Sequence, residues 1–171
     1  IINNTYKMIS FPNAKINLGL NIVSKREDGY HNLETVFLPL PIKDALEIVV
    51  STQGKDQFIA SGLKVTNNAN DNLVMKALEL MRTLYEIPPL EIHLLKKIPF
   101  GAGIGGGSAD AAFMLKLLNS KFELGATSLD LADIAVKIGA DCPFFIYNKP
   151  MYATGIGEKL EEITLSLDGY F

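Results

Sequence analysis

The chain has 171 residues, of which 48% are hydrophobic and 20% charged, a composition typical of one globular domain with its own core. Its net charge of −3 argues against a nucleic-acid-binding surface, so an anionic ligand must be bound locally. One cysteine excludes an intramolecular disulfide framework, and no long apolar run or signal-peptide pattern is found, so we expect a soluble cytoplasmic protein with no membrane partner.

The first part of the chain has the apolar alternation of β-strands. An edge strand is expected from Tyr6 to Phe11, and a strand with a two-residue period follows from Pro12 to Val23. Four apolar side chains are expected on its buried face: Ile16, Leu18, Leu20 and Ile22. The opposite face carries Lys15, Asn17, Gly19 and Asn21. Alternation leaves two interpretations open, an ordinary solvent face or a cleft wall that presents Lys15 and Asn17 to a polar ligand.

A charged turn over residues 25–29 leads through Tyr30 and His31 into more strands. These are expected over residues 33–40, 44–50, 57–63 and 90–95. No metal-ligand spacing pairs His31 with His93, and we interpret His93 as structural.

A polar loop over residues 67–72 precedes the first helix. Asn72 is expected to cap this helix, whose apolar residues repeat at helical spacing from Leu73 to about Glu86. The pair Pro88-Pro89 ends it, because proline cannot continue a helix.

Residues 99–112 form the stretch around which the rest of the chain is organised. Five glycines fall within the seven positions 101–107, between an expected strand and a helix that ends near Asn119. Glycine permits positive φ and close backbone approach, and the free N–H groups of a first helical turn favour an anion. Ser108 is a natural N-cap whose hydroxyl could also reach a phosphate or its Mg²⁺. The pattern predicts a phosphate-binding loop.

Three other interpretations of this loop are less well supported. A Walker A loop needs Lys directly before Ser108, where this chain has Gly107. A dinucleotide-binding loop matches G-x-G-x-x-G, but its helix should be followed by a strand, whereas a second helix is expected from Ser128 to Ile138. A glycine turn without a ligand would keep five glycines at a cost in backbone entropy.

A second candidate site follows the helix that Ser128 is expected to cap and Gly139 to end. Asp141 stands at the start of a strongly apolar expected strand that runs to Tyr147. It is either a turn residue that binds nearby amides or a general base, and the sequence leaves both open. Cys142 is interpreted as a buried thiol. A last hairpin is expected over residues 151–154 and 158–165.

Four segments together resemble one protein family closely. They are residues 12–18, residues 28–31, residues 99–112 and residues 139–144. They resemble the galactokinase–homoserine kinase–mevalonate kinase–phosphomevalonate kinase (GHMP) superfamily, in the family's own order. Ala-Lys-Ile-Asn-Leu and Asp-Gly-Tyr-His are similar to the branch that acts on 4-diphosphocytidyl-2-C-methyl-D-erythritol in non-mevalonate isoprenoid synthesis.

The resemblance implies ATP-dependent phosphorylation of the 2-hydroxyl of that small molecule, with Mg²⁺ bridging the phosphates. It makes Asp141 the catalytic base and Lys15 its electrostatic partner, two residues that we therefore expect to be in contact. Asn17, Tyr30 and His31 would bind the substrate, the last two at its cytidine. Asn72 would lie near the adenine, and the ATP phosphates would be wrapped by Pro99, Gly101, Ala102, Gly103, Ile104, Gly105, Gly106, Gly107 and Ser108.

The resemblance also sets the expected fold and domain organisation. We expect an α+β domain over residues 1–171, with a mixed, largely antiparallel sheet and helices on one side. Members of the family continue into a C-terminal domain where this chain ends, so we expect an exposed, self-associating face. Two alternatives stay open: a nucleotide-binding fragment without catalysis, and another small-molecule kinase of the same superfamily.

Overall fold

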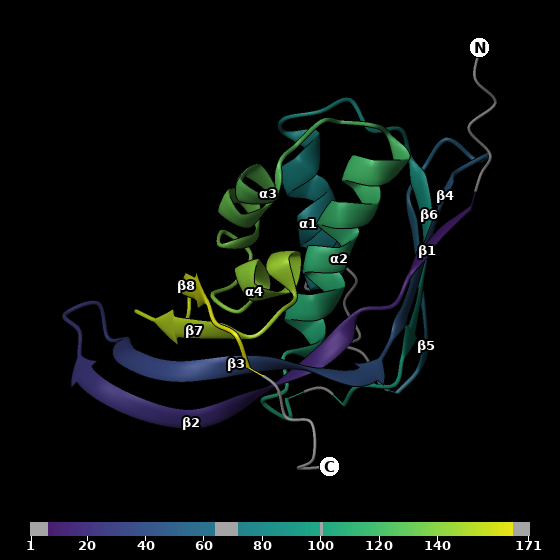
Figure 1. Cartoon of the computed structure of the whole chain (residues 1–171). Helices are drawn as coiled ribbons and strands as arrows, with labels where there is room; N and C mark the ends of the chain where they lie inside the picture. The colour runs from purple at the N-terminus through teal and green to yellow at the C-terminus, as the bar shows by residue number, and fades with distance from the viewer. Residues whose placement is uncertain (1–6, 64–71, 100, 166–171) are drawn as a thin grey trace.

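The computed structural model describes residues 7–63, 72–99 and 101–165. Parts of one expected strand and of two expected loops lie outside the described residues, namely Tyr6, residues 67–71 and Phe100. The described part is an α+β fold in which helices fill the angle between two four-stranded sheets (Figure 1). The expected fold class is confirmed, although the strands form two sheets instead of one.

The first sheet has the strand order β1-β4-β6-β5. Its strands are β1 (Met8–Ser10), β4 (Ala45–Val50), β5 (Gln57–Gly62) and β6 (Leu90–Lys96). Only the β5–β6 pair is parallel among the described strands, because the chain between them crosses over through helix α1 (Leu73–Arg82).

The second sheet is antiparallel throughout its described strands, in the order β2-β3-β7-β8. Its strands are β2 (Asn13–Lys25), β3 (His31–Lys43), β7 (Met151–Thr154) and β8 (Lys159–Glu162). Two of the points where the chain passes from one sheet to the other are neighbours, after β1 and before β4. There the backbone N–H of Asp44 donates to the carbonyl of Pro12 at 2.8 Å, which holds the two crossings together.

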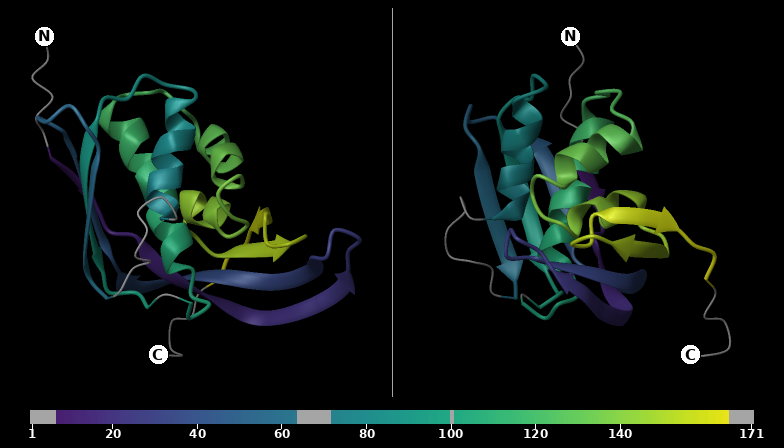
Figure 2. Two further views of the ribbon diagram at one scale, coloured as in Figure 1. Left: turned by 180° about the vertical axis from the view of Figure 1, so that it is seen from behind. Right: turned by 90° about the vertical axis from the view of Figure 1, so that its left-hand side faces the viewer.

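The core lies where helices α1 and α2 (Gly106–Lys121) pack on the inner face of the first sheet (Figures 1 and 2). Leu46 and Ile48 of β4 and Ile92 and Leu94 of β6 are fully or almost fully buried in this core. Helix α3 (Ser128–Ala135) and helix α4 (Cys142–Tyr147) complete the helical layer beside the second sheet. No helix among the described residues is long and apolar enough to span a membrane.

Several local predictions were wrong. Helices α1 and α3 end at Arg82 and Ala135, three or four residues before the ends expected from the sequence. Residues 142–147, expected as a strand, form helix α4, because Pro143 fits a first helical turn and a short, fully apolar run does not distinguish the two structures. Helix α2 starts at Gly106 after a Gly105 cap, so Ser108 lies inside its first turn. Helix α3 is capped by Thr127, whose reciprocal bonds with Asp130 form a capping box.

The expected buried face of β2 is also wrong over the outer half of the strand. Leu20 and Ile22 are 56% and 68% exposed, because the β2–β3 hairpin projects beyond the helices that cover its base (Figure 1). Three register shifts also break the two-residue period, one of them at Gly19, whose φ is +70°. Lys15, expected on the other face, is buried instead.

Candidate active site

The glycine loop has left-handed backbone angles that residues with a side chain rarely adopt. Gly101, Gly103 and Gly105 all have φ between +71° and +73°. A Cβ atom on Gly101 or Gly103 would meet no atom within 4 Å, so at these two positions the backbone angle alone favours glycine. A Cβ on Gly105 would come within 2.8 Å of the Phe145 ring and 3.1 Å of the Lys15 side chain. At Gly105 the lack of space is therefore a second constraint.

The loop encloses a hollow of about 270 Å³ above the start of helix α2. Its lining includes every loop residue that the sequence analysis assigned to ATP, from Pro99 to Ser108, together with Leu73 and Asp141. Asn72 is not among the lining residues. Its side-chain oxygen accepts the N–H of Val74 at 2.9 Å and caps helix α1, as the sequence predicted.

Lys15 and Asp141 meet at this hollow. The Lys15 ammonium lies 3.0 Å from Oδ2 of Asp141, which confirms the expected contact between two residues far apart in the chain. Lys15 also donates to the Asn17 side-chain oxygen at 2.7 Å and sits 4.4 Å from the centroid of the Phe37 ring. The Lys15 side chain is 5% exposed and that of Asp141 is 32% exposed. The cation is thus fixed inside the protein, while the carboxylate is open to a ligand.

Helix α4 presents Asp141 to the hollow. Asp141 occupies the N-cap position of α4, yet its side chain makes no capping hydrogen bond. The turn-residue interpretation therefore loses its main support, since the carboxylate contacts Lys15 instead of helix amides. Asp141 is also the one carboxylate among the residues that line the hollow.

Three phenylalanines form an aromatic base beneath the pair, and the sequence analysis did not identify them as site residues. Phe144 lies 5.2 Å from Phe37 and 5.0 Å from Phe145, centroid to centroid, in tilted and edge-on arrangements. All three are buried. Phe37 alternates inward along β3, which is a signal of core position and gives no sign of a contact with Lys15.

Cys142 is fully buried, as expected of a structural thiol. Burial raises the pKa of this thiol to about 11, against the smaller lowering effect of a hydrogen bond with Ser108. The thiol is therefore protonated near neutral pH. Ser108 lines the hollow while its hydroxyl contacts Cys142.

Tyr30 and His31 lie at the tip of the β2–β3 hairpin and are not among the residues that line the glycine hollow. Both are exposed, Tyr30 by 60%. His93 contacts Glu91 at 2.7 Å on β6, in agreement with its structural interpretation.

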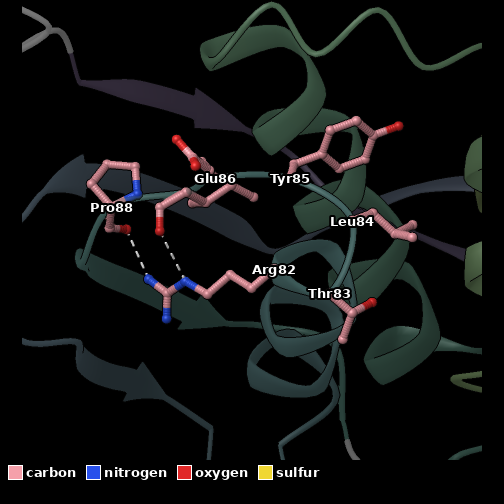
Figure 3. A pocket seen from close by; sticks show the side chains of 7 residues that line it. Arg82, Thr83, Leu84, Tyr85, Glu86 and Pro88 are labelled. Atoms are coloured by element: carbon pink, nitrogen blue, oxygen red, sulfur yellow. Dashed lines mark hydrogen bonds between the residues drawn. The ribbon is translucent and has the colours of Figure 1, made fainter.

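A larger hollow of about 730 Å³ lies elsewhere, where the chain turns from α1 toward β6 (Figure 3). Its cation, Arg82, donates to the carbonyls of Ile87 and Pro88 and pairs with Asp56. The Arg82 guanidinium is thus engaged in closing this turn, and we assign the hollow no role in ligand binding.

Residues 72–149 match the family model described as "GHMP kinases N terminal domain". The chain is 61% identical over 164 residues to the 4-diphosphocytidyl-2-C-methyl-D-erythritol kinase of Parabacteroides distasonis, covering 96% of this chain and 60% of that protein. It is 56% identical to the Bacteroides fragilis protein of the same name, over 95% of this chain and 60% of the relative. The chain thus spans about 60% of the length of these curated relatives.

Solved structures agree with these matches. A crystal structure titled as 4-(cytidine 5'-diphospho)-2C-methyl-D-erythritol kinase is 34% identical, with a TM-score of 0.78 over 93% of this chain and 56% of that one. Homoserine kinase from Cytophaga hutchinsonii, 17% identical, shares the fold with a TM-score of 0.66 over 93% of this chain and 51% of its own. The glycine loop, the fold and the sequence matches together show that the chain is similar to the N-terminal domain of GHMP kinases.

Proposed function

We propose that this protein is an ATP-dependent kinase that phosphorylates the 2-hydroxyl of 4-diphosphocytidyl-2-C-methyl-D-erythritol, a step of isoprenoid synthesis. The observation that carries the proposal is the 3.0 Å contact between Lys15 and Asp141 at the edge of the glycine hollow. In this contact a fixed cation and an accessible carboxylate lie beside the glycine loop, which we propose binds the phosphates. The names of the relatives at 54–61% identity supply the substrate.

The glycine loop would hold the ATP phosphates. Its left-handed glycines would let the backbone approach the phosphates closely, and the start of helix α2 would add its free amides and its dipole. Gly106, Gly107 and Ser108 provide these first-turn positions and line the hollow. Asn72 would approach the adenine from the start of helix α1.

Mg²⁺ would be held mainly by the phosphates themselves. Asp141 is the carboxylate that the lining residues offer, and the described residues contain no cluster of three or more metal-binding side chains. Because Asp141 serves as the base in this proposal, Mg²⁺ would take its ligands from the phosphates and from water, of which it usually keeps several. When bound, the ion neutralises negative charge on the transferred phosphoryl group.

Asp141 and Lys15 would divide the chemistry between them. Asp141 accepts the proton of the attacking hydroxyl, and its partly exposed carboxylate can be reached by that hydroxyl. Lys15 stabilises negative charge that develops during transfer, and its aromatic surroundings keep the ammonium in one position. Asn17, bonded to Lys15, would contact the substrate beside it.

Tyr30 and His31 would bind the cytidine at the tip of the hairpin. The exposed Tyr30 ring can stack on the base, and His31 can form a hydrogen bond with it. Inhibition by cytidine nucleotides would separate this activity from those of other kinases of the family. A cytoplasmic location and a domain that comprises residues 1–171 stay predictions.

The test is a coupled assay of ADP release with Mg-ATP and the cytidyl substrate, on the complete gene product and its Asp141→Asn variant. We expect turnover in the wild type and a loss of 100-fold or more, on the order of general-base catalysis, in the variant. Asp133→Asn, on the exposed side of α3, is the matched control. Wild-type protein that binds ATP without phosphorylating this substrate would favour a nucleotide-binding role or a different acceptor.

A further inference from the structure

Three charged side chains are buried together beneath the glycine loop, away from the Lys15–Asp141 pair. The Lys96 ammonium lies 2.5 Å from Oδ2 of Asp44 and 2.7 Å from Oδ2 of Asp110. The side chains of Lys96, Asp44 and Asp110 are 7%, 0% and 3% exposed. Asp44 precedes β4, Lys96 ends β6 and Asp110 lies in the second turn of α2, so this buried cluster joins three elements.

Burying these three charged side chains costs more free energy than burying apolar side chains in the same space. Lys96 continues the inward-facing row of Ile92 and Leu94 on β6, at a position that usually carries an apolar side chain. Two carboxylates share one cation, and Oδ1 of Asp110 has no hydrogen-bond partner among the described residues. The free energy lost when charged groups leave water usually cancels the free energy gained from their attraction. Folding stability alone therefore does not explain the cluster.

Asp44 connects the cluster to the first end of the glycine loop. Its Oδ1 accepts the backbone N–H of Lys97 at 2.5 Å and that of Ile98 at 2.8 Å. These two residues directly precede Pro99, the first residue of the loop that lines the hollow. The backbone N–H of Asp44 donates to Pro12, three residues before Lys15. Asp44 thus fixes the loop's entrance relative to the strand that carries Lys15.

Lys96 and Asp110 connect the cluster to the other end of the loop. A Cβ atom on Gly106, the first residue of α2, would lie 3.2 Å from the Lys96 ammonium and 2.6 Å from the Ile98 side chain. The Lys96 side chain therefore runs directly against the helix start, and Asp110 holds the ammonium there from one turn further along α2. The same three side chains thus contact the segments at both ends of the loop.

We propose that the Asp44–Lys96–Asp110 cluster positions the glycine loop for nucleotide phosphates, and that Asp110 is a positioning residue for ATP. The inference rests on the proposed function in one respect, since it takes the loop to be the ATP site. Asp110 does not line the hollow and acts through Lys96 and the start of helix α2. Its loss should therefore weaken ATP binding and leave binding of the second substrate unchanged.

The experiment compares Asp110→Asn with the control Asp133→Asn in the complete gene product. Calorimetry with Mg-ATP measures affinity without turnover, and kinetics give KM for each substrate. We expect Asp110→Asn to raise both Kd and KM for ATP about tenfold or more, as expected for a misplaced positioning element, with KM for the acceptor within about twofold. The control should match the wild type. Equal ATP affinity in folded Asp110→Asn and wild type would overturn the proposal.

A second variant separates positioning from folding. The triple substitution Asp44→Asn, Lys96→Met and Asp110→Leu removes all three charges, which buried positions usually tolerate, and the asparagine oxygen can still accept the N–H groups of Lys97 and Ile98. We expect it to unfold at a similar or higher temperature and still bind ATP about tenfold more weakly; wild-type affinity would overturn the proposal. If the wild type binds ATP but does not phosphorylate the cytidyl substrate, the proposed function fails. The ATP affinities of the two variants, compared with the wild type, still test the role of the cluster. A wild type that binds no ATP would overturn both.

Discussion

The backbone N–H of Lys15 donates a hydrogen bond to the carbonyl of Ile104 at 2.9 Å. This bond joins the middle of the glycine loop to the strand that carries the buried ammonium. The loop and Lys15 therefore hold a fixed relative position before any ligand arrives. Such preorganisation is what phosphoryl transfer requires of a protein, because positioning and charge stabilisation supply most of the catalysis.

Replacing Lys15 should abolish most of the activity with little loss of fold. Lys15→Met keeps a long, unbranched side chain and the backbone hydrogen bond to Ile104, but it removes the charge beside Asp141. We expect kcat to fall roughly 100-fold or more, as for the loss of one electrostatic contact to a transition state. Lys55→Met, in the exposed turn between β4 and β5, is the matched control and should retain wild-type kcat. A Lys15→Met enzyme with near-normal kcat would exclude Lys15 from the chemistry.

Two glycines with the same backbone angle should differ in their sensitivity to alanine. Gly101→Ala meets no atom, so its cost is that of a left-handed alanine, about 1–2 kcal/mol. Gly105→Ala adds contacts with Phe145 and Lys15, for which overpacking costs a further ~1–3 kcal/mol. Urea denaturation of the two variants measures the difference in the free energy of unfolding. Equal losses would mean that the Phe145 ring moves aside freely.

The sequence predicted the loop, the Lys15–Asp141 contact and the class of fold because each rests on a local motif or on a family pattern. Five glycines before a helix indicate positive φ angles and close backbone approach, whatever the rest of the sequence contains. The pairing of Lys15 with Asp141 depends on tertiary structure, and only the resemblance to a known family brought these two residues together.

The parts that the sequence did not predict depend on long-range packing. The exposure of Leu20 and Ile22 follows from where the helices end, and the register shifts in β2 are invisible in its alternation. The apolar run of α4 suits a helix and a strand equally. Lys96 follows the alternation of β6 that places every second side chain inward, and this alternation could have predicted its burial. A lysine at a strand end is, however, far more often exposed.

Asp110 should make stability depend on pH. Burial raises the pKa of its carboxyl from 3.8 to about 7, more than the Lys96 charge lowers it. The folded state therefore binds a proton more tightly than the unfolded state does. Its contribution to stability is fully present below pH 4 and is lost as the pH rises toward 7. We expect the free energy of unfolding of the wild type, relative to Asp110→Asn, to fall across this range. A constant difference between the two would show that Asp110 titrates with an ordinary pKa.

The side chain of Asn148 should support the active site from the far end of helix α4. Asn148 caps α4 with φ +53°, and its amide donates to the side-chain oxygen of Asn13 at 2.8 Å. Asn13 lies two residues before Lys15, and Asp141 starts the same helix that Asn148 ends. This bond therefore braces the two elements that carry the contact between Lys15 and Asp141.

Asn148→Gly tests this brace because glycine relieves the left-handed backbone angle while it removes the bond. Glu123→Gly is the matched control, since Glu123 has φ +49° beyond the end of α2 and is not among the residues that line the hollow. We expect the control to gain up to about 1 kcal/mol of stability with unchanged kcat. Asn148→Gly should gain less, because it loses a hydrogen bond worth about 1 kcal/mol, and its kcat should fall severalfold as the Lys15–Asp141 geometry loosens. If both variants keep full kcat, the brace stabilises the fold without positioning the catalytic pair.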